Sequence, residues 1–169
     1  QNEPFITTHP VDIAVCENTD TALHIETSGD VLGYQWQVST NGGTDFNDIT
    51  DANAVKLELN QLAVANSGNL YRCIITNDYY EKISDTAEVI VHENPEPVVT
   101  DADYVLTSTT ADAYQWYKDN VIINGANSQT YTVSENGEYW VVVTNEFGCE
   151  GSSNRMIIVI ESVENELSR

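Results

Sequence analysis

The sequence predicts an all-β protein, and three observations support this fold class. Thr, Val, Ile, Tyr and Asn are plentiful, while long stretches rich in Ala, Leu, Lys and Glu are absent. Apolar and polar residues alternate with a period of two in residues 22–27, 54–59 and 86–93, as they do in half-buried strands. The tripeptide Tyr-Gln-Trp occurs twice, at 34–36 and 114–116, which indicates two similar domains.

The alternation also assigns an inward face to each predicted strand. In the first strands these inward residues are Leu23, Ile25, Val55, Leu57, Leu59, Ala87, Val89 and Val91. In each Tyr-Gln-Trp strand the Tyr and the Trp are expected to point into the core, while Gln35 and Gln37 face water. Residues 60–68 are compatible with one helical turn, and Asn-Gly at 41–42, 124–125 and 136–137 is typical of tight turns.

A second repeated pattern divides the chain. Residues 66–77 (NSGNLYRCIITN) and 134–145 (SENGEYWVVVTN) each contain a turn followed by a strand that begins with Tyr. We therefore predict one domain over 1–93 and a smaller one over 94–160, followed by a polar linker or tail over 161–169.

The segment between the two predicted domains contains Pro95 and Pro97. Proline fixes φ and cannot donate to a strand ladder, so we expect a short semi-rigid joint. The partners expected first are therefore other domains of the same polypeptide. Because the chain begins QNEPFITTHP, we expect that a signal has been removed or that this is a piece of a longer protein.

The charge of the chain is strongly one-sided. It has 27 acidic and 6 basic residues among 169, a net charge of -21, and both predicted domains are acidic. Such a field repels nucleic acid and anionic lipid head groups. No apolar run approaches the length of about 20 residues that a membrane helix needs. We therefore expect neither a nucleic-acid partner nor membrane insertion.

No catalytic pattern is present in the sequence. His9, His24 and His92 do not stand at metal-ligand spacing, and there is no nucleophile elbow or phosphate-binding glycine loop. Carboxylates are so abundant that a pair at catalytic separation would arise by chance. The expectation is a protein that is not an enzyme and has no cofactor and no metal.

The repeated residues resemble the immunoglobulin-like β-sandwich, in which a strand carries a Trp and a later strand carries a Tyr two residues before a Cys. Trp36, Tyr71 and Cys73 match this pattern in the first domain, and Trp116 and Tyr139 match it in the second. The resemblance implies two consecutive antiparallel Greek-key sandwiches. It also implies that these Trp and Tyr residues are structural core residues, each Tyr hydroxyl bonding to the chain upstream.

A narrower resemblance is carried by "YQWQVSTNGGTDFNDI" and "YQWYKDNVIINGANSQTYTVSENGEYWVVVTNEFGC". These segments resemble the immunoglobulin-like repeats of large secreted and surface proteins of Bacteroidota exported by the type IX secretion system. The end "SVENELSR" is similar to the linker before the sorting domain of such proteins. This resemblance implies an extracellular or bacterial cell-surface location.

The same resemblance implies a disulfide between Cys16 and Cys73. This pairing places Cys16 near the start of the second strand of the sandwich, beside the strand that carries Cys73. Cys149 then remains as a free thiol or pairs outside this chain. A disulfide in the first domain would indicate an oxidising, extracytoplasmic setting.

One pair of aromatic residues is a candidate for ligand binding. Because the Trp and Tyr of the second domain point inward, their neighbours Tyr117 and Trp140 should point outward from adjacent strands and lie close together. The first domain has the polar residues Gln37 and Arg72 at the same places. An exposed aromatic pair suits a neutral sugar or an apolar protein surface. The alternatives are a cross-strand packing pair or a contact with the neighbouring domain.

Three functional hypotheses follow from these features. The first is a non-catalytic spacer or adhesion segment of a larger secreted or surface-anchored bacterial protein. The second is a carbohydrate-binding accessory module that uses Tyr117 and Trp140, so a glycan or a surface protein is a possible partner. The third is Ca²⁺ binding at the joint through Glu93, Glu96 and Asp101 or Asp103.

Overall fold

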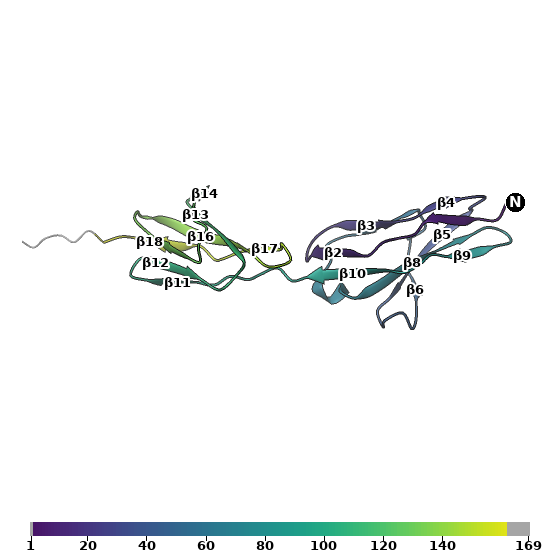
Figure 1. Ribbon diagram of the computed structural model, residues 1–169, viewed down its shortest axis with the longest axis horizontal. Helices are drawn as coiled ribbons and strands as arrows, with labels where there is room; N and C mark the ends of the chain where they lie inside the picture. The colour runs from purple at the N-terminus through teal and green to yellow at the C-terminus, as the bar shows by residue number, and fades with distance from the viewer. Residues whose placement is uncertain (1, 162–169) are drawn as a thin grey trace, which may run out of the picture. The chain divides into compact units, whose positions relative to one another are not determined.

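The computed structural model describes residues 2–161 and shows two compact β-rich units, with the division between Glu93 and Asn94. Each unit consists of two layers of strands (Figure 1), and a hydrophobic core fills each unit. Beyond Glu161, the predicted polar tail lies outside the described residues. Within the described part of the chain, no helix is long and apolar enough to span a bilayer.

The first unit pairs its strands in two layers. One layer contains β1 (Phe5–Thr8), β3 (Thr21–His24), β4 (Glu26–Ser28) and β7 (Lys56–Leu59). The other contains β2 (Ile13–Cys16), β5 (Gly33–Ser39), β6 (Asn47–Asp48), β8 (Asn69–Thr76), β9 (Glu81–Ile83) and β10 (Ala87–His92). Strands β10 and β2 are parallel, whereas the other described pairs are antiparallel. The predicted helical turn is the 3₁₀ helix η1 (Val64–Asn66).

The second unit has fewer strands. One layer contains β11 (Val99–Ala102), β12 (Val105–Ser108) and β15 (Thr130–Thr132). The other contains β13 (Ala113–Lys118), β14 (Val121–Ile122), β16 (Gly137–Thr144), β17 (Glu150–Ser152) and β18 (Met156–Ile158). Strands β13 and β16 form the longest ladder, from Ala113 opposite Thr144 to Lys118 opposite Tyr139.

Each unit has its own core, and each core contains one Trp of the repeated tripeptide. Trp36 and Trp116 are both fully buried, and Tyr71 and Tyr139 are nearly so. The inward residues of the other predicted strands are buried as well, except Val55, which is 46% exposed. Tyr34 and Tyr114 are half-buried and pack against their cores. Val55 precedes β7 and is outside its ladder, so the period of two does not extend to it.

Two hairpins use positive-φ residues that are not glycines. Asp119 and Asn120 have φ of 48° and 65° between β13 and β14, and Asp103 and Tyr104 have φ of 51° and 62° between β11 and β12. Two consecutive positive φ values define the two-residue turn that matches the twist of paired strands. The predicted Asn-Gly turns at 41–42 and 124–125 are confirmed, with φ of 71° at Gly42 and 80° at Gly125. By contrast, the predicted turn at 136–137 is wrong, because Gly137 begins β16 without a positive φ.

The predicted Cys16–Cys73 disulfide is wrong. Cys73 is a free, buried thiol, whereas Cys16 is disulfide-bonded. Cys149, expected as a free thiol or with a partner outside the chain, is also disulfide-bonded.

The physical reason is the position of Cys16 in β2, a strand beside β10 rather than in the facing layer. Along β10, Cys16 of β2 pairs with His92, at the end of the strand. Tyr71 of the antiparallel strand β8 pairs with Ala87, at the start of β10, and Cys73 lies two residues beyond that pair, farther from His92. That offset of seven residues corresponds to about 23 Å along the sheet. A disulfide requires Cα atoms within about 7 Å of each other.

Candidate functional site

The two buried Trp residues are held by the same set of backbone hydrogen bonds. The Trp36 indole Nε1 donates to the carbonyl of Ala54 at 2.9 Å, and the Trp116 Nε1 donates to that of Ser128 at 2.9 Å. Each buried indole N–H therefore has a partner, which avoids the cost of an unsatisfied donor.

The backbone around each Trp repeats a second pattern. The Trp36 amide donates to the Ala52 carbonyl and its carbonyl accepts from Ile49, while the Trp116 amide donates to Ala126 and its carbonyl accepts from Ile123. The sequence signal for this network is Ile-x-x-Ala after each Tyr-Gln-Trp, at 49–52 and 123–126. The sequence alone does not predict this network, because the two Ile-x-x-Ala segments lie at different distances from the Trp of their domain.

The Gln of the tripeptide also has a structural role that the alternation missed. The Gln35 side-chain amide donates to the carbonyls of Trp36 and Ile49, both at 2.9 Å. The Gln115 amide donates to the carbonyls of Trp116 and Ile123 at 2.9 and 3.0 Å. Both side chains are half-buried, so the expectation that Gln35 faces water is wrong. A strand period assigns the face of a side chain, but it cannot show which backbone groups lie beside it.

The expected tyrosine corner is present in one domain only. The Tyr139 hydroxyl donates to the Glu135 carbonyl at 2.8 Å, four residues upstream. Within the described residues, the Tyr71 hydroxyl makes no such bond. In the first domain the corresponding corner is held by Ser67, whose hydroxyl accepts from the Val91 amide at 2.9 Å.

The expected aromatic pair is found on the outer face of the second domain. Tyr117 and Trp140 are cross-strand neighbours on β13 and β16, with ring centroids 4.2 Å apart and ring planes 11° from parallel. On the far side of Trp140, the Arg155 guanidinium carbon lies 5.0 Å from the ring centroid. Ile122 stands opposite Tyr117 on β14. We call Ile122, Tyr117, Trp140 and Arg155 together the outer aromatic row.

This geometry limits what the outer aromatic row can bind. Trp140 has Tyr117 against one face and Arg155 against the other, and both aromatic residues are only half-exposed. The Trp140 Nε1 is buried and has no hydrogen-bond partner among the described residues. Stacking a sugar on Trp140 would require Arg155 or Tyr117 to move, and a sugar hydroxyl cannot reach the indole nitrogen. The arrangement corresponds to the cross-strand packing alternative.

The first domain places a polar network at the same positions. Arg72 Nε donates to Gln37 Oε1 at 2.8 Å, and Gln37 Nε2 donates to Asp48 Oδ1 at 2.7 Å. The Arg72 guanidinium carbon lies 3.9 Å from the centroid of the Phe46 ring. Each unit therefore uses its own side chains to cover the centre of this outer face, one with an ion-dipole network and the other with stacked rings.

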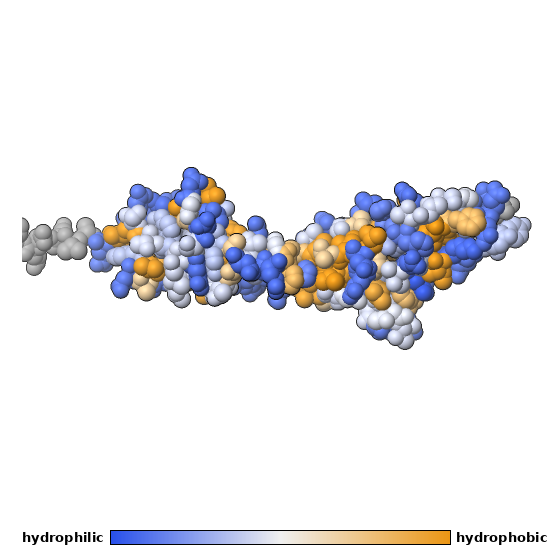
Figure 2. All heavy atoms as spheres, viewed as in Figure 1, coloured by the Kyte–Doolittle hydropathy of each residue, from blue (hydrophilic) through white to orange (hydrophobic). Residues whose placement is uncertain are grey.

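The titratable side chains are spread over both units in the described part of the chain. No group of three or more His, Cys, Asp or Glu residues that could hold a metal ion occurs among residues 2–161. Burial raises the pKa of the Cys73 thiol to about 11, so this Cys is in its unreactive protonated form. On the second domain, the face seen in Figure 2 is mainly hydrophilic, with small separate groups of hydrophobic residues.

Together, the paired layers, the buried Trp residues and the tyrosine corner define a tandem immunoglobulin-like protein. Solved structures with this fold include the four N-terminal Ig domains of Dscam1 isoform 6.9, with 15% identity and a TM-score of 0.49 over 92% of this chain and 45% of that chain. Titin domains Z1Z2 in complex with telethonin show 20% identity and a TM-score of 0.46, covering 96% of this chain and 98% of that chain. The N-terminal Ig1-2 module of the Drosophila receptor protein tyrosine phosphatase DLAR shows 15% identity and a TM-score of 0.42, covering 94% and 99%.

These similarities describe the fold alone, and the chain spans less than half the length of the Dscam1 structure. No curated protein sequence matches the chain. Residues 7–93 match the family described as a domain of unknown function (DUF8696), and the chain belongs to this family.

Proposed function

We propose that this chain is a non-catalytic spacer or adhesion segment of a larger secreted or surface-anchored bacterial protein. The observation that carries the proposal is the role of the residues that the two domains share. Tyr-Gln-Trp and Ile-x-x-Ala are used in both to bury an indole and to satisfy backbone groups. What has been repeated is therefore a scaffold and not a reactive site.

The state of the cysteines supports an extracytoplasmic setting. Cys16 and Cys149 are disulfide-bonded, and disulfides persist in oxidising compartments and are rare in the cytosol. The net charge of -21 is compatible with solubility in a salty exterior, where screening limits repulsion to about 10 Å or less.

The location can be tested in the organism that encodes the chain. Antibodies against it should label intact cells or the culture medium, and the protein recovered from there should contain one alkylatable thiol after denaturation without reductant. Labelling that requires cell lysis, together with three alkylatable thiols, would overturn the proposal.

Carbohydrate binding by Tyr117 and Trp140 is the second candidate function. It is supported by the meeting of the two rings on the outer face, whereas the cover that Arg155 gives to Trp140 disfavours it. A glycan array comparing the native chain with Trp140→Ala separates the two functions. Loss of a glycan signal in the variant supports this candidate, and an array on which the native chain binds no glycan rejects it.

A further inference from the structure

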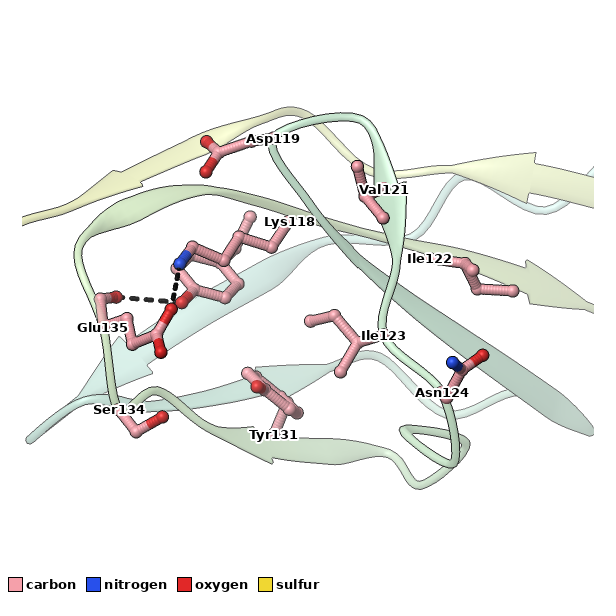
Figure 3. Close-up of a pocket in the computed structure, with 10 residues that line it drawn as sticks. Lys118, Asp119, Val121, Ile122, Ile123, Asn124, Tyr131, Ser134 and Glu135 are labelled. Atoms are coloured by element: carbon pink, nitrogen blue, oxygen red, sulfur yellow. Dashed lines mark hydrogen bonds and ion pairs between the residues drawn. The ribbon is translucent and has the colours of Figure 1, made fainter.

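A hollow of about 460 Å³ lies in the second domain, where the hairpin of β13 and β14 separates from β15 and the segment before β16. Figure 3 shows Ile123 and Tyr131 at its centre, with Lys118 and Glu135 on one side and Val121 and Ile122 on the other. Its volume is within the range of about 300–1,000 Å³ that small-molecule sites occupy.

Lys118 stands in this hollow at a position where the strand pattern calls for an apolar residue. It is two residues after the buried Trp116 and is the cross-strand partner of Tyr139, so it is on the inner side of its sheet. The equivalent residue in the first domain is Val38, which pairs with Tyr71 and packs against the core. The second domain therefore places a charged group where its counterpart continues the core.

The position of Lys118 is fixed by its neighbours. Its ammonium forms an ion pair with the Glu135 carboxylate. Its aliphatic stem lies across Gly137, where an added Cβ would come within 2.7 Å of the Lys118 Cε. A side chain at position 137 would therefore displace the flexible end of Lys118 and not the backbone.

Stability alone does not require this ion pair. The Glu135 side chain is 71% exposed, and ion pairs that are exposed to solvent contribute little to stability. The first domain has the apolar residue Val38 at the equivalent position. A charged residue that breaks the local pattern without a structural need is expected at a functional site. Two neighbours of Lys118 are held in place: the Tyr139 hydroxyl donates to the backbone carbonyl of Glu135, and the Tyr131 ring stacks on the buried Trp116 with ring centroids 6.0 Å apart.

We propose that this hollow binds the ring of a neutral saccharide, with Lys118 and Glu135 contacting its hydroxyl groups and Tyr131 and Ile123 contacting its apolar face. A paired ammonium and carboxylate offer a donor and an acceptor side by side, which suits adjacent sugar hydroxyls. The Ser134 hydroxyl and the Asn124 amide add further neutral donors and acceptors to the lining.

The charges around the hollow favour a neutral ligand over a charged one. An anion would meet Glu135 and Asp119, in a protein of net charge -21. A cation would meet Lys118, whose partner carboxylate is already engaged. A neutral polyhydroxy ring satisfies both members of the ion pair without separating them.

The proposal is tested by titrating the full chain, followed by amide NMR, with galactose, mannose, xylose, N-acetylglucosamine and cellobiose up to about 50 mM. Glucuronate and glucosamine serve as the charged counterparts. We expect saturable shifts centred on residues 121–124 and 134–135 with at least one neutral saccharide, and none with the charged sugars. Absence of saturable shifts with every neutral saccharide, or equal binding of glucuronate, would overturn the proposal.

Two variants locate the binding site. Lys118→Met keeps the aliphatic length of the side chain and should weaken binding at least about tenfold while the remaining amide spectrum stays native. Lys56→Met is the matched control, because Lys56 forms a comparable ion pair with Glu58 in the first domain, and it should leave the affinity unchanged. Binding that survives Lys118→Met, or that is lost in Lys56→Met with a native spectrum, would place the site elsewhere.

Discussion

The two domains share the hydrogen-bond network around the buried Trp, but they differ at two sets of neighbouring positions. Around each buried Trp, the hydrogen bonds agree residue by residue and nearly to a tenth of an ångström. The positions beside this network differ in kind: Val38 is replaced by Lys118, and the Gln37–Arg72 pair by Tyr117–Trp140. The comparison teaches that the Trp network specifies the sandwich, whereas the positions that differ are free to take another role.

The largest effect should follow from removing the buried indoles. Trp36→Ala and Trp116→Ala each leave a large cavity and lose the hydrogen bond of Nε1, so each should cost about 3–5 kcal/mol. The loss is measured by urea unfolding, followed through amide NMR signals of the affected domain. Comparable losses in the two domains would confirm a common network, and a loss below about 1 kcal/mol in either would contradict it.

The glutamines of the tripeptide should come next. Gln35→Leu and Gln115→Leu each remove an amide that serves two backbone carbonyls, so each should cost about 1–3 kcal/mol. Gln37→Leu is the matched control, because Gln37 makes its bonds to side chains on the outer face. If Gln37→Leu costs as much as Gln35→Leu in urea unfolding, the buried carbonyls are not the reason.

Much of this architecture could be predicted from the sequence because strands bury alternate residues. The fold class and the burial of Trp36 and Trp116 required only that period and the repeated tripeptide. The juxtaposition of Tyr117 and Trp140 followed from the inward direction of their neighbours.

The features that could not be predicted depend on contacts between segments of unequal spacing. The role of Gln35 depends on where the chain returns to β5 and brings the Ile49 carbonyl beside it. The alternation of apolar and polar residues gives no information about that position. Cys16 belongs to a parallel edge strand whose register with β10 becomes visible only in three dimensions. The inward position of Lys118 was available from the period, but the hollow around it depends on how the two layers separate.

Val38 and Lys118 occupy equivalent inner positions in the two domains. Exchanging them tests whether the charged group in the hollow is needed for folding. Val38→Lys places an unpaired charge against the first core, and since Val38 is half-buried and a lysine can extend toward water, the cost should be about 1–2 kcal/mol. Lys118→Val in the second domain should be close to neutral, because an ion pair with a largely exposed carboxylate contributes little to stability. Both are measured by urea unfolding, and a clear destabilisation by Lys118→Val would show that the ion pair is structural.

The outer faces should show a smaller contrast. A double-mutant cycle with Tyr117→Ala and Trp140→Ala should give a coupling of about 0.5–1.5 kcal/mol for stacked rings. The matching cycle with Gln37→Ala and Arg72→Ala should give less than about 1 kcal/mol, because both side chains are half-exposed and water competes for their hydrogen bond. A coupling near zero for the aromatic pair would mean that the stack does not hold β13 and β16 together.

The smallest effect concerns the charge state of the Lys118–Glu135 pair. The side-chain hydrogen bond with Glu135 is the main cause that raises the pKa of Lys118 above 10.5, and the bond with Lys118 lowers the pKa of Glu135 below 4.5. A raised lysine pKa contributes stability below 10.5 that is lost as the pH rises through the folded value. A lowered carboxyl pKa contributes stability above 4.5 that is lost as the pH falls through the folded value.

The pair should therefore contribute only between these limits. We expect Glu135→Gln to lower the melting temperature of the second domain slightly at neutral pH. The difference from the native chain should shrink as the pH falls below 4.5 and vanish once the pH is below the lowered pKa of Glu135 in the folded protein. Glu146→Gln, at an exposed carboxylate, should show no such convergence. A difference that persists unchanged in acid would mean that Glu135 acts through its shape and not through its charge, and the donor–acceptor pair proposed for the hollow would lose its physical basis.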